Sequence, residues 1–183
     1  MTVLSVDSVG FCAHYSEVGD WAFDFALALS RRWSAPLKVF HFLSDPYNPD
    51  DHTAEELSTH ERAKLAVQRE RELRLYYDER AGDYLEVGFR LCEDPEWTEL
   101  HRCLLIREFQ VLVLGYVTPA ATFAGRPIED FAAAFVAPVV LVGPTNRHEL
   151  HVNPQAALLS DKLVVPPDRS TLIKQRSAVP HRV

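Results

Sequence analysis

Apolar residues along this chain occur either in short unbroken runs or at helical spacing. The short runs are rich in β-favouring residues and bounded by turn residues, and they predict five strands at residues 3–6, 37–43, 84–92, 111–116 and 138–142. The run at 111–116 has no polar interruption, which is typical of a strand buried on both faces. The first run ends at Asp7 and Ser8, so we expect a long loop from Val9 to Gly19.

Between these runs, apolar residues recur every three or four positions, as on one face of a helix. The clearest helical pattern covers residues 18–33. A second covers residues 53–80, where Glu and Arg interleave with a narrow apolar stripe. Pro95 and Pro127 predict the first turns of two further helices. The apolar stripe of the second helix is Leu57, Leu65, Leu73 and Tyr76.

The alternation of strands and helices predicts an α/β fold. We expect a five-stranded parallel sheet, doubly wound, with helices on both faces. Ligands of such sheets bind outside the carboxyl ends of the strands. This rule places Asp7, Ser44, Gly115 and Tyr116 near any site.

The composition changes after residue 143. Residues 144–183 contain six Lys and Arg against three Asp and Glu, with prolines at four further positions beyond Pro144. We therefore expect one domain at 1–143 and a basic tail at 144–183 that is partly ordered at most. The tail either docks on its own core, a neighbouring subunit or a partner protein, or is partly disordered.

Charge and hydropathy exclude several classes of protein. The 183 residues carry a formal charge of −7, which argues against a nucleic-acid binder held by a basic face. The longest apolar run, 131–142, contains Pro138 and is shorter than the roughly 20 residues that a membrane span needs. Residues 1–6 lack the basic start of a secretory signal, so we expect a cytoplasmic protein without a membrane or nucleic-acid partner.

Five short motifs, taken in order, indicate a family. They are Val6-Asp7-Ser8 after the first strand, Phe40-His41-Phe42-Leu43 in the second, Asp94-Pro95 before the third helix, Val113-Leu114-Gly115 at the end of the fourth strand, and Gly125 thirteen residues before Pro138. With this order and spacing, residues 1–143 resemble a universal stress protein domain. The resemblance implies five parallel strands, dimers that often form through the last strand, and ATP bound in some members.

The resemblance also implies which residues would contact a nucleotide. They are Asp7, Leu43, Leu114, Gly115, Gly125 and Arg126, with Asp7 at the position near adenine and ribose. An Asx turn that ends the strand is the alternative role for Asp7.

In the ATP-binding members of the family, the phosphate loop resembles the pattern G-x-x-G, then nine residues, then G-[ST]. The corresponding loop of this chain departs from that pattern. Only Gly115 and Gly125 remain, and the loop is about three residues shorter. Arg126 replaces the small hydroxyl residue, and Pro127 has no N–H to donate. Two lost charge-assisted hydrogen bonds cost about 3–6 kcal/mol, which argues against tight ATP binding. Arg126 could hold a phosphate or carboxylate instead, or it is solvated or paired with a neighbouring acid.

Three cysteines raise the possibility of thiol chemistry. Cys12 lies two residues from His14, so an activated thiolate is a candidate. Cys92 and Cys103 are better explained as packed thiols than as metal ligands. An odd number of cysteines without C-x-x-C predicts neither a disulfide framework nor a zinc site.

The sequence therefore predicts a non-catalytic regulatory or scaffold protein of the universal stress type. We expect a homodimer formed through residues 138–142, because the last strand would lie at an exposed edge. No metal is expected, and an adenine nucleotide is the one candidate cofactor. The alternative is a sensor of AMP, ADP or ATP, or a weak hydrolase, that uses Asp7, Gly115, Gly125 and Arg126.

Overall fold

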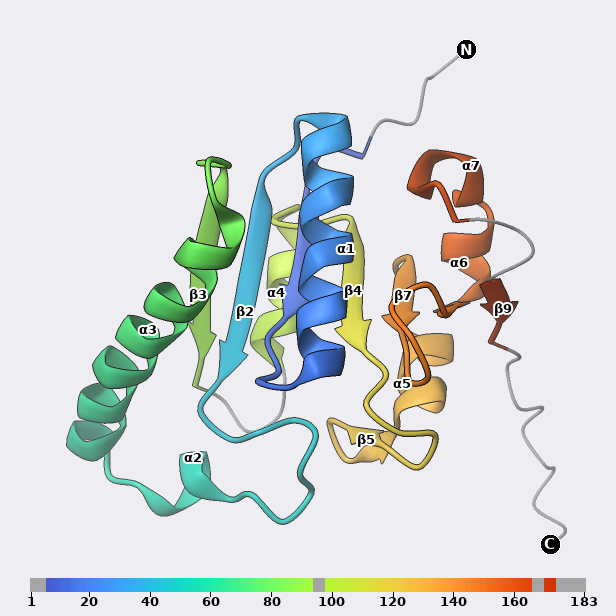
Figure 1. Cartoon of the computed structure of the whole chain (residues 1–183). Helices are drawn as coiled ribbons and strands as arrows, with labels where there is room; N and C mark the ends of the chain where they lie inside the picture. Colours follow the sequence, from blue (N-terminus) through green and yellow to red (C-terminus); the bar gives the residue numbers. More distant parts are fainter. Residues whose placement is uncertain (1–5, 94–97, 166–169, 174–183) are drawn as a thin grey trace, which may run out of the picture.

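Among the residues that the structure describes, seven strands form a mixed sheet at the centre of the molecule (Figure 1). The computed structural model describes residues 6–93, 98–165 and 170–173. The first five strands in the order β3-β2-β1-β4-β7 are parallel, β8 is antiparallel to β7, and β9 is parallel to β8. Their bounds are β1 Val9–Cys12, β2 Leu37–Phe42, β3 Val87–Cys92, β4 Val111–Gly115, β7 Val139–Val142, β8 Leu150–Val152 and β9 Ser170–Leu172. The α/β fold class predicted from the sequence is confirmed, with seven strands in place of five.

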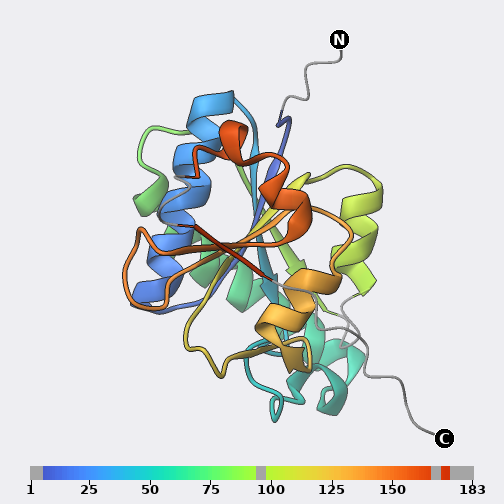
Figure 2. The same cartoon turned by 90° about the vertical axis from the view of Figure 1, so that its right-hand side faces the viewer.

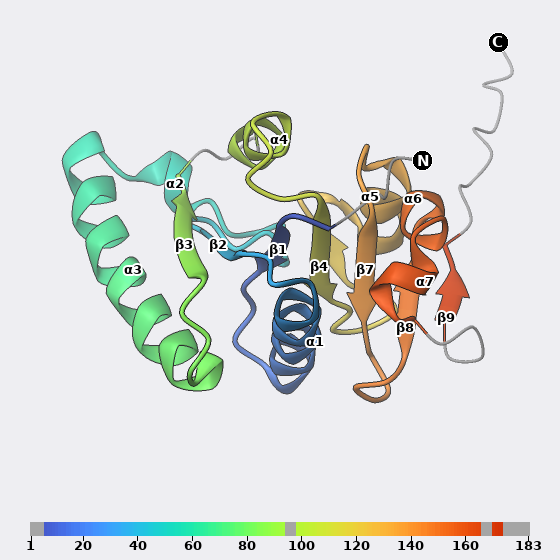
Figure 3. The ribbon, with the colours of Figure 1, turned by 90° about the horizontal axis from the view of Figure 1, so that it is seen from above.

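Helices cover both faces of the sheet (Figure 3). One face packs against α1 (Glu17–Trp33), α3 (Thr59–Ala81), α6 (Pro154–Ala157) and α7 (Ser160–Leu163). The other packs against α4 (Thr98–Leu105) and α5 (Ile128–Ala134). The short α2 (Thr53–Glu56) precedes α3, and a two-stranded hairpin of β5 (Thr122–Phe123) and β6 (Arg126–Pro127) precedes α5.

The two long helices form where the apolar spacing predicts them. Ser16 caps α1 by accepting a hydrogen bond from the Gly19 amide, at 2.9 Å. Ser58 and Glu61 form a capping box at the start of α3, which separates it from α2. The buried stripe of α3 differs in part from the prediction, because Tyr77 rather than Tyr76 is fully buried beside Leu73.

The first strand differs from the prediction. Residues 3–5 lie outside the described residues, and Val6 to Ser8 precede the strand, which runs from Val9 to Cys12. Gly10 is a turn signal in the sequence, but here a Cβ at this position would lie 2.9 Å from Cγ of Phe109. Glycine therefore lets the Phe109 ring pack against the strand. The shift moves Asp7 from the carboxyl end of the strand to its amino end.

The prediction of a tail from residue 144 is also wrong for the described part of that segment. Strands β8 and β9 extend the sheet, and α6 and α7 pack on it (Figure 2). Asn153 is fully buried between β7 and α5. Because β8 pairs with β7, residues 138–142 lie inside the sheet, and the predicted dimer contact through that strand is wrong.

Candidate functional site

The carboxyl ends of β1, β2 and β4 meet at one edge of the sheet, where ligands of this type of fold bind. Ala13 and His14 follow β1, while Gly115 ends β4. A Cβ on Gly115 would lie 3.4 Å from the Cα of Gly19 in the first turn of α1. The first turn of α1 thus packs against the end of β4 at ordinary van der Waals distance.

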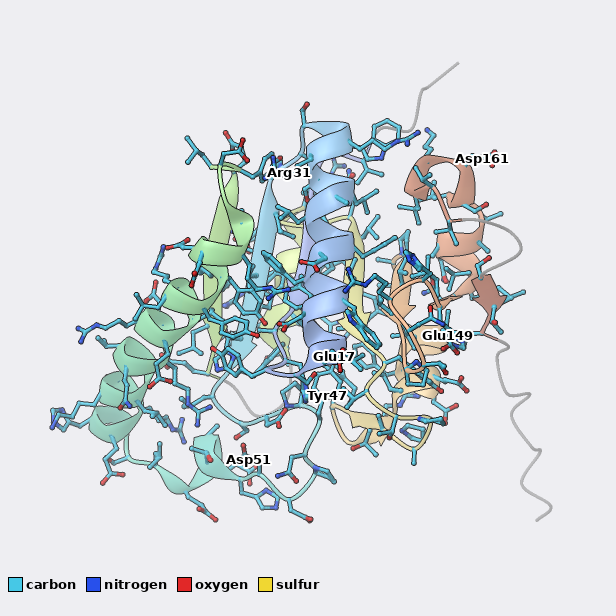
Figure 4. The ribbon with its side chains drawn as sticks, viewed as in Figure 1. Glu17, Arg31, Tyr47, Asp51, Glu149 and Asp161 are labelled. Carbon is cyan, nitrogen blue, oxygen red and sulfur yellow. The ribbon has the colours of Figure 1, made fainter. Side chains whose placement is uncertain are left out.

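The side chain of Tyr47 fills the crevice between the ends of β1 and β4. Its hydroxyl donates a hydrogen bond to the carbonyl of Gly115, at 3.0 Å. Its ring meets His14 edge-on, with centroids 4.5 Å apart, and Phe123 at 5.1 Å. Figure 4 labels Tyr47 at this end of the sheet, below the first turn of α1. Burial raises the pKa of Tyr47 well above its usual value, so the phenol stays neutral.

Hydrogen bonds within the loop after β2 hold Tyr47 in this position. Asp45 accepts from the amide of Tyr47 at 2.9 Å, and Asp51 accepts from the amide of Asp45 at 2.8 Å. Ser44 accepts from the amide of Ala54, at 2.8 Å. These are the turn interactions that Ser and Asp favour. The loop is therefore held by hydrogen bonds from its own side chains.

A hollow of about 310 Å³ lies beside the Tyr47 crevice, between β2 and α3. Arg69 on its wall donates to the carbonyl of Leu43 at 2.8 Å. Burial, with the nearby charge of Arg69, lowers the pKa of His41 to about 4, so this imidazole is neutral at pH 7. Three carboxylates against one guanidinium make the wall acidic. The lining residues are Ala13, His14, Tyr15, His41, Phe42, Asp45, Pro46, Asp51, Arg69 and Glu72.

The loop expected to hold phosphate is occupied by contacts within the protein. The amide of Ala124 donates to the carbonyl of Pro46, and that of Ile128 donates to Ala121, both at 2.9 Å. Gly125 has a φ of +77° and lies in an exposed turn between β5 and β6. The Arg126 side chain is exposed, and no hydrogen bond or ion pair joins it to another described residue.

The structure does not bring all six predicted nucleotide-contacting residues together. Gly115 lies at the crevice, and Leu43 is buried at the end of β2. Leu114 lies in the hydrophobic core on the α4 and α5 side of the sheet. Asp7 lies at the opposite end of the sheet, where its amide donates to Gln110 at 2.7 Å. A nucleotide site that combines Asp7 with Gly115 is therefore wrong.

Sequence reasoning missed Tyr47 and Arg69 at this end of the sheet, and it considered His14 only as a partner of the Cys12 thiol. The signal for Tyr47 was an aromatic residue inside a segment that otherwise has the composition of a polar turn, Asp45-Pro46-Tyr47-Asn48-Pro49.

The three cysteines are free and buried. Burial raises the pKa of Cys12 well above its usual value, and His14 contacts Ser16 and Tyr47 instead of forming an ion pair with the thiol. A reactive thiolate at Cys12 is therefore contradicted. Among the described residues, no group of three His, Cys, Asp or Glu side chains could hold a metal ion.

Comparisons with known proteins were made by sequence and by structure. No protein-family model and no curated protein matches the sequence. Within the described residues, no helix combines the length and the hydropathy needed to cross a bilayer.

Several solved structures match in fold. One is a universal stress protein in complex with cAMP, at 20% identity and a TM-score of 0.47, covering 76% of this chain and 98% of that one. Another is universal stress protein UspA from Lactobacillus plantarum, at 15% identity and a TM-score of 0.39, covering 94% and 100%. A macrolide-efflux protein from Streptococcus pneumoniae matches at 18% identity and a TM-score of 0.44, covering 79% of this chain and 55% of that one. Two of these three solved structures are universal stress proteins.

Proposed function

We propose that this protein is a non-catalytic regulatory or scaffold protein of the universal stress type, which acts through a homodimer and contacts with other proteins. The observation that carries the proposal is the position of Tyr47. Its ring fills the crevice between β1 and β4, and its hydroxyl bonds to Gly115. A nucleotide would have to displace this side chain and break the hydrogen bond.

The charges at this end of the sheet support the same proposal. The hollow beside Tyr47 carries the carboxylates of Asp45, Asp51 and Glu72 against the single cation of Arg69. Phosphate groups are repelled by such a wall. Amides that could hold phosphate at Ala124 and Ile128 already donate to carbonyls.

Nucleotide binding is tested on the full chain as purified. The protein is denatured, and the released small molecules are analysed by mass spectrometry. Native protein is then titrated with ATP, ADP and AMP by calorimetry. We expect no stoichiometric nucleotide and no binding heat at millimolar ligand. Co-purified nucleotide, or a dissociation constant in the micromolar range, would contradict the proposal.

We propose the amino ends of β1, β2 and β3 as the surface for the second copy. A hollow of about 530 Å³ opens there. Leu85 on its wall is 90% exposed, so a second copy that covers this surface would remove its apolar side chain from water. Lys38 and Arg107 lie in the same wall as Glu86. Charges of both signs suit a two-fold contact, in which the same patch meets itself.

The dimer is tested by light scattering and sedimentation at micromolar concentration. We expect a dimer for the native chain and at least a tenfold weaker dimer for Leu85→Glu, because two carboxylates would enter the contact. Leu75→Glu is the matched control, since Leu75 is 71% exposed on α3 and is not among the residues that line this hollow. A monomeric native chain, or equal weakening by both substitutions, would contradict this surface.

A further inference from the structure

An apolar cavity of about 380 Å³ lies between α1 and α7. Its wall on α1 is formed by Phe25, Ala28, Leu29 and Arg32, which are three or four residues apart and so share one face of the helix. Leu163 and Val164 close the other side. The volume falls in the range of small-molecule sites in proteins.

The cavity exists because the C-terminal segment folds back onto α1 (Figure 1, Figure 2). The indole N–H of Trp33 donates to the carbonyl of Lys162, at 2.8 Å, and fixes α7 beside the end of α1. Leu29 and Leu163 are 4% and 2% exposed and form an apolar floor, whereas Ala28 and Arg32 lie on an exposed rim. The universal stress domain expected at residues 1–143 lacks α7 and therefore has no such site.

The charge at the cavity is a single cation. Of the described residues that line it, Arg32 alone is charged, and no carboxylate faces it. The Arg32 side chain is exposed and makes no hydrogen bond or ion pair with another described residue. The adjacent Arg31 is different, because it bonds to the carbonyl of Ala81 at 3.1 Å and to Asp83 at 2.7 Å. Figure 4 shows Arg31 on the side of α1 away from α7.

Val164 shapes the α7 side of the cavity. This β-branched residue has a φ of +54°, in the left-handed region that such side chains rarely adopt. Its side chain lines the cavity although the residue is 49% exposed. Val164 is the C-cap of α7, and the left-handed conformation ends that helix with a backbone hydrogen bond to the carbonyl of Ser160. A ligand in the cavity would remove part of the exposed Val164 surface from water.

We infer that the α1–α7 cavity binds a small amphipathic anion, with an alkyl chain against Leu29 and Leu163 and a carboxylate bonded to Arg32. An aliphatic carboxylate of medium length has this chemistry. The apolar wall supplies affinity that grows with chain length, and the guanidinium fork selects the anionic head group. The site is separate from the Tyr47 crevice and from the amino-end hollow.

The test is calorimetry of the full chain with hexanoate, octanoate, decanoate and neutral decanol. We expect saturable binding of decanoate, with affinity increasing about fifteenfold for each two methylene groups. Arg32→Gln should weaken decanoate at least tenfold and leave decanol unchanged. Ala28→Trp, on the exposed rim, should abolish binding of both by filling the cavity. Arg147→Gln, which removes a charge from the exposed loop between β7 and β8, is the matched control and should bind decanoate normally.

Three results would overturn the inference. They are the absence of saturable binding of decanoate, equal binding of decanoate by the native chain and Arg32→Gln, and binding that Ala28→Trp does not reduce. Circular dichroism and urea unfolding establish that each variant is folded. If Ala28→Trp fails to fold, the comparison of decanoate with decanol in Arg32→Gln still decides the question.

Discussion

Asn153 is the residue on which the attachment of the C-terminal segment depends most. Its side chain is fully buried and makes four hydrogen bonds, each 2.9 Å long. The oxygen accepts from the amides of Val139 and Ala156, and the nitrogen donates to the carbonyls of Ala132 and Ala137. All donors and acceptors of the amide group are thus satisfied.

Asn153→Ala would leave four buried backbone groups without partners. At about 1–1.5 kcal/mol for each net hydrogen bond, the expected loss is about 4–6 kcal/mol of unfolding free energy. This is a large part of the stability of a typical domain. Asn153→Asp keeps the acceptors, but it removes both donors and buries a charge, so we expect a loss at least as large.

The assay is urea unfolding of the full chain, followed by circular dichroism and by exchange of the Val139 amide proton. Asn146→Ala is the control, because Asn146 is exposed and accepts one hydrogen bond, from the amide of His148. It should cost less than about 1 kcal/mol. A loss of less than about 1 kcal/mol for Asn153→Ala would refute the conclusion that residues 150–165 are part of the domain.

Three further predictions concern pH, packing and thiol reactivity. The folded pKa of His41, about 4, lies below its unfolded value near 6.5, so the unfolded chain binds more protons between these values. The free energy of unfolding should therefore fall by about 2 kcal/mol from pH 7 to pH 5 because of His41, and His41→Asn should remove this pH-dependent loss. If the unfolding free energy of His41→Asn falls with pH as steeply as that of the native chain, the prediction is contradicted. Gly10→Ala should lower the free energy of unfolding in urea by about 1–3 kcal/mol, because the new methyl group meets Phe109. Gly88→Ala meets only the flexible end of Lys38 and should be nearly neutral. Equal effects of the two substitutions would contradict the conclusion that packing against Phe109 requires glycine at position 10. The buried Cys12, Cys92 and Cys103 should react with iodoacetamide far more slowly than a peptide cysteine, and rapid labelling of Cys12 in the folded protein would contradict the assignment.

The sequence was sufficient for the elements that have long and regular patterns. The residues predicted at 37–43, 111–116 and 138–142 form β2, β4 and β7, and the apolar face at 18–33 forms α1. In each case the pattern reflects burial against the core, which is a property of the segment itself.

The remaining elements depend on partners far away in the sequence. In the sequence, Gly10 is a turn signal. The structure shows that this position of the strand needs a glycine because the Phe109 ring packs against it. The strands β8 and β9 have three residues each, too few for a periodic signal, and Asn153-Pro154 looks like a turn. Its four buried hydrogen bonds exist only once β7 and α5 are in place. Tyr47 likewise lies in a polar loop whose target, Gly115, is 68 residues away.

The position of Tyr47 is the central claim, and amide NMR spectroscopy of the full chain during titration with ATP tests it most directly. The amides of Ala13, Gly115 and Tyr116 surround the crevice and report on any ligand that enters it. We predict that these resonances keep their chemical shifts in the native chain at ATP concentrations up to several millimolar. Any shift caused by ATP should be found in Tyr47→Ala, in which the crevice is empty. Saturable shifts of Gly115 and Tyr116 in the native chain would contradict the account.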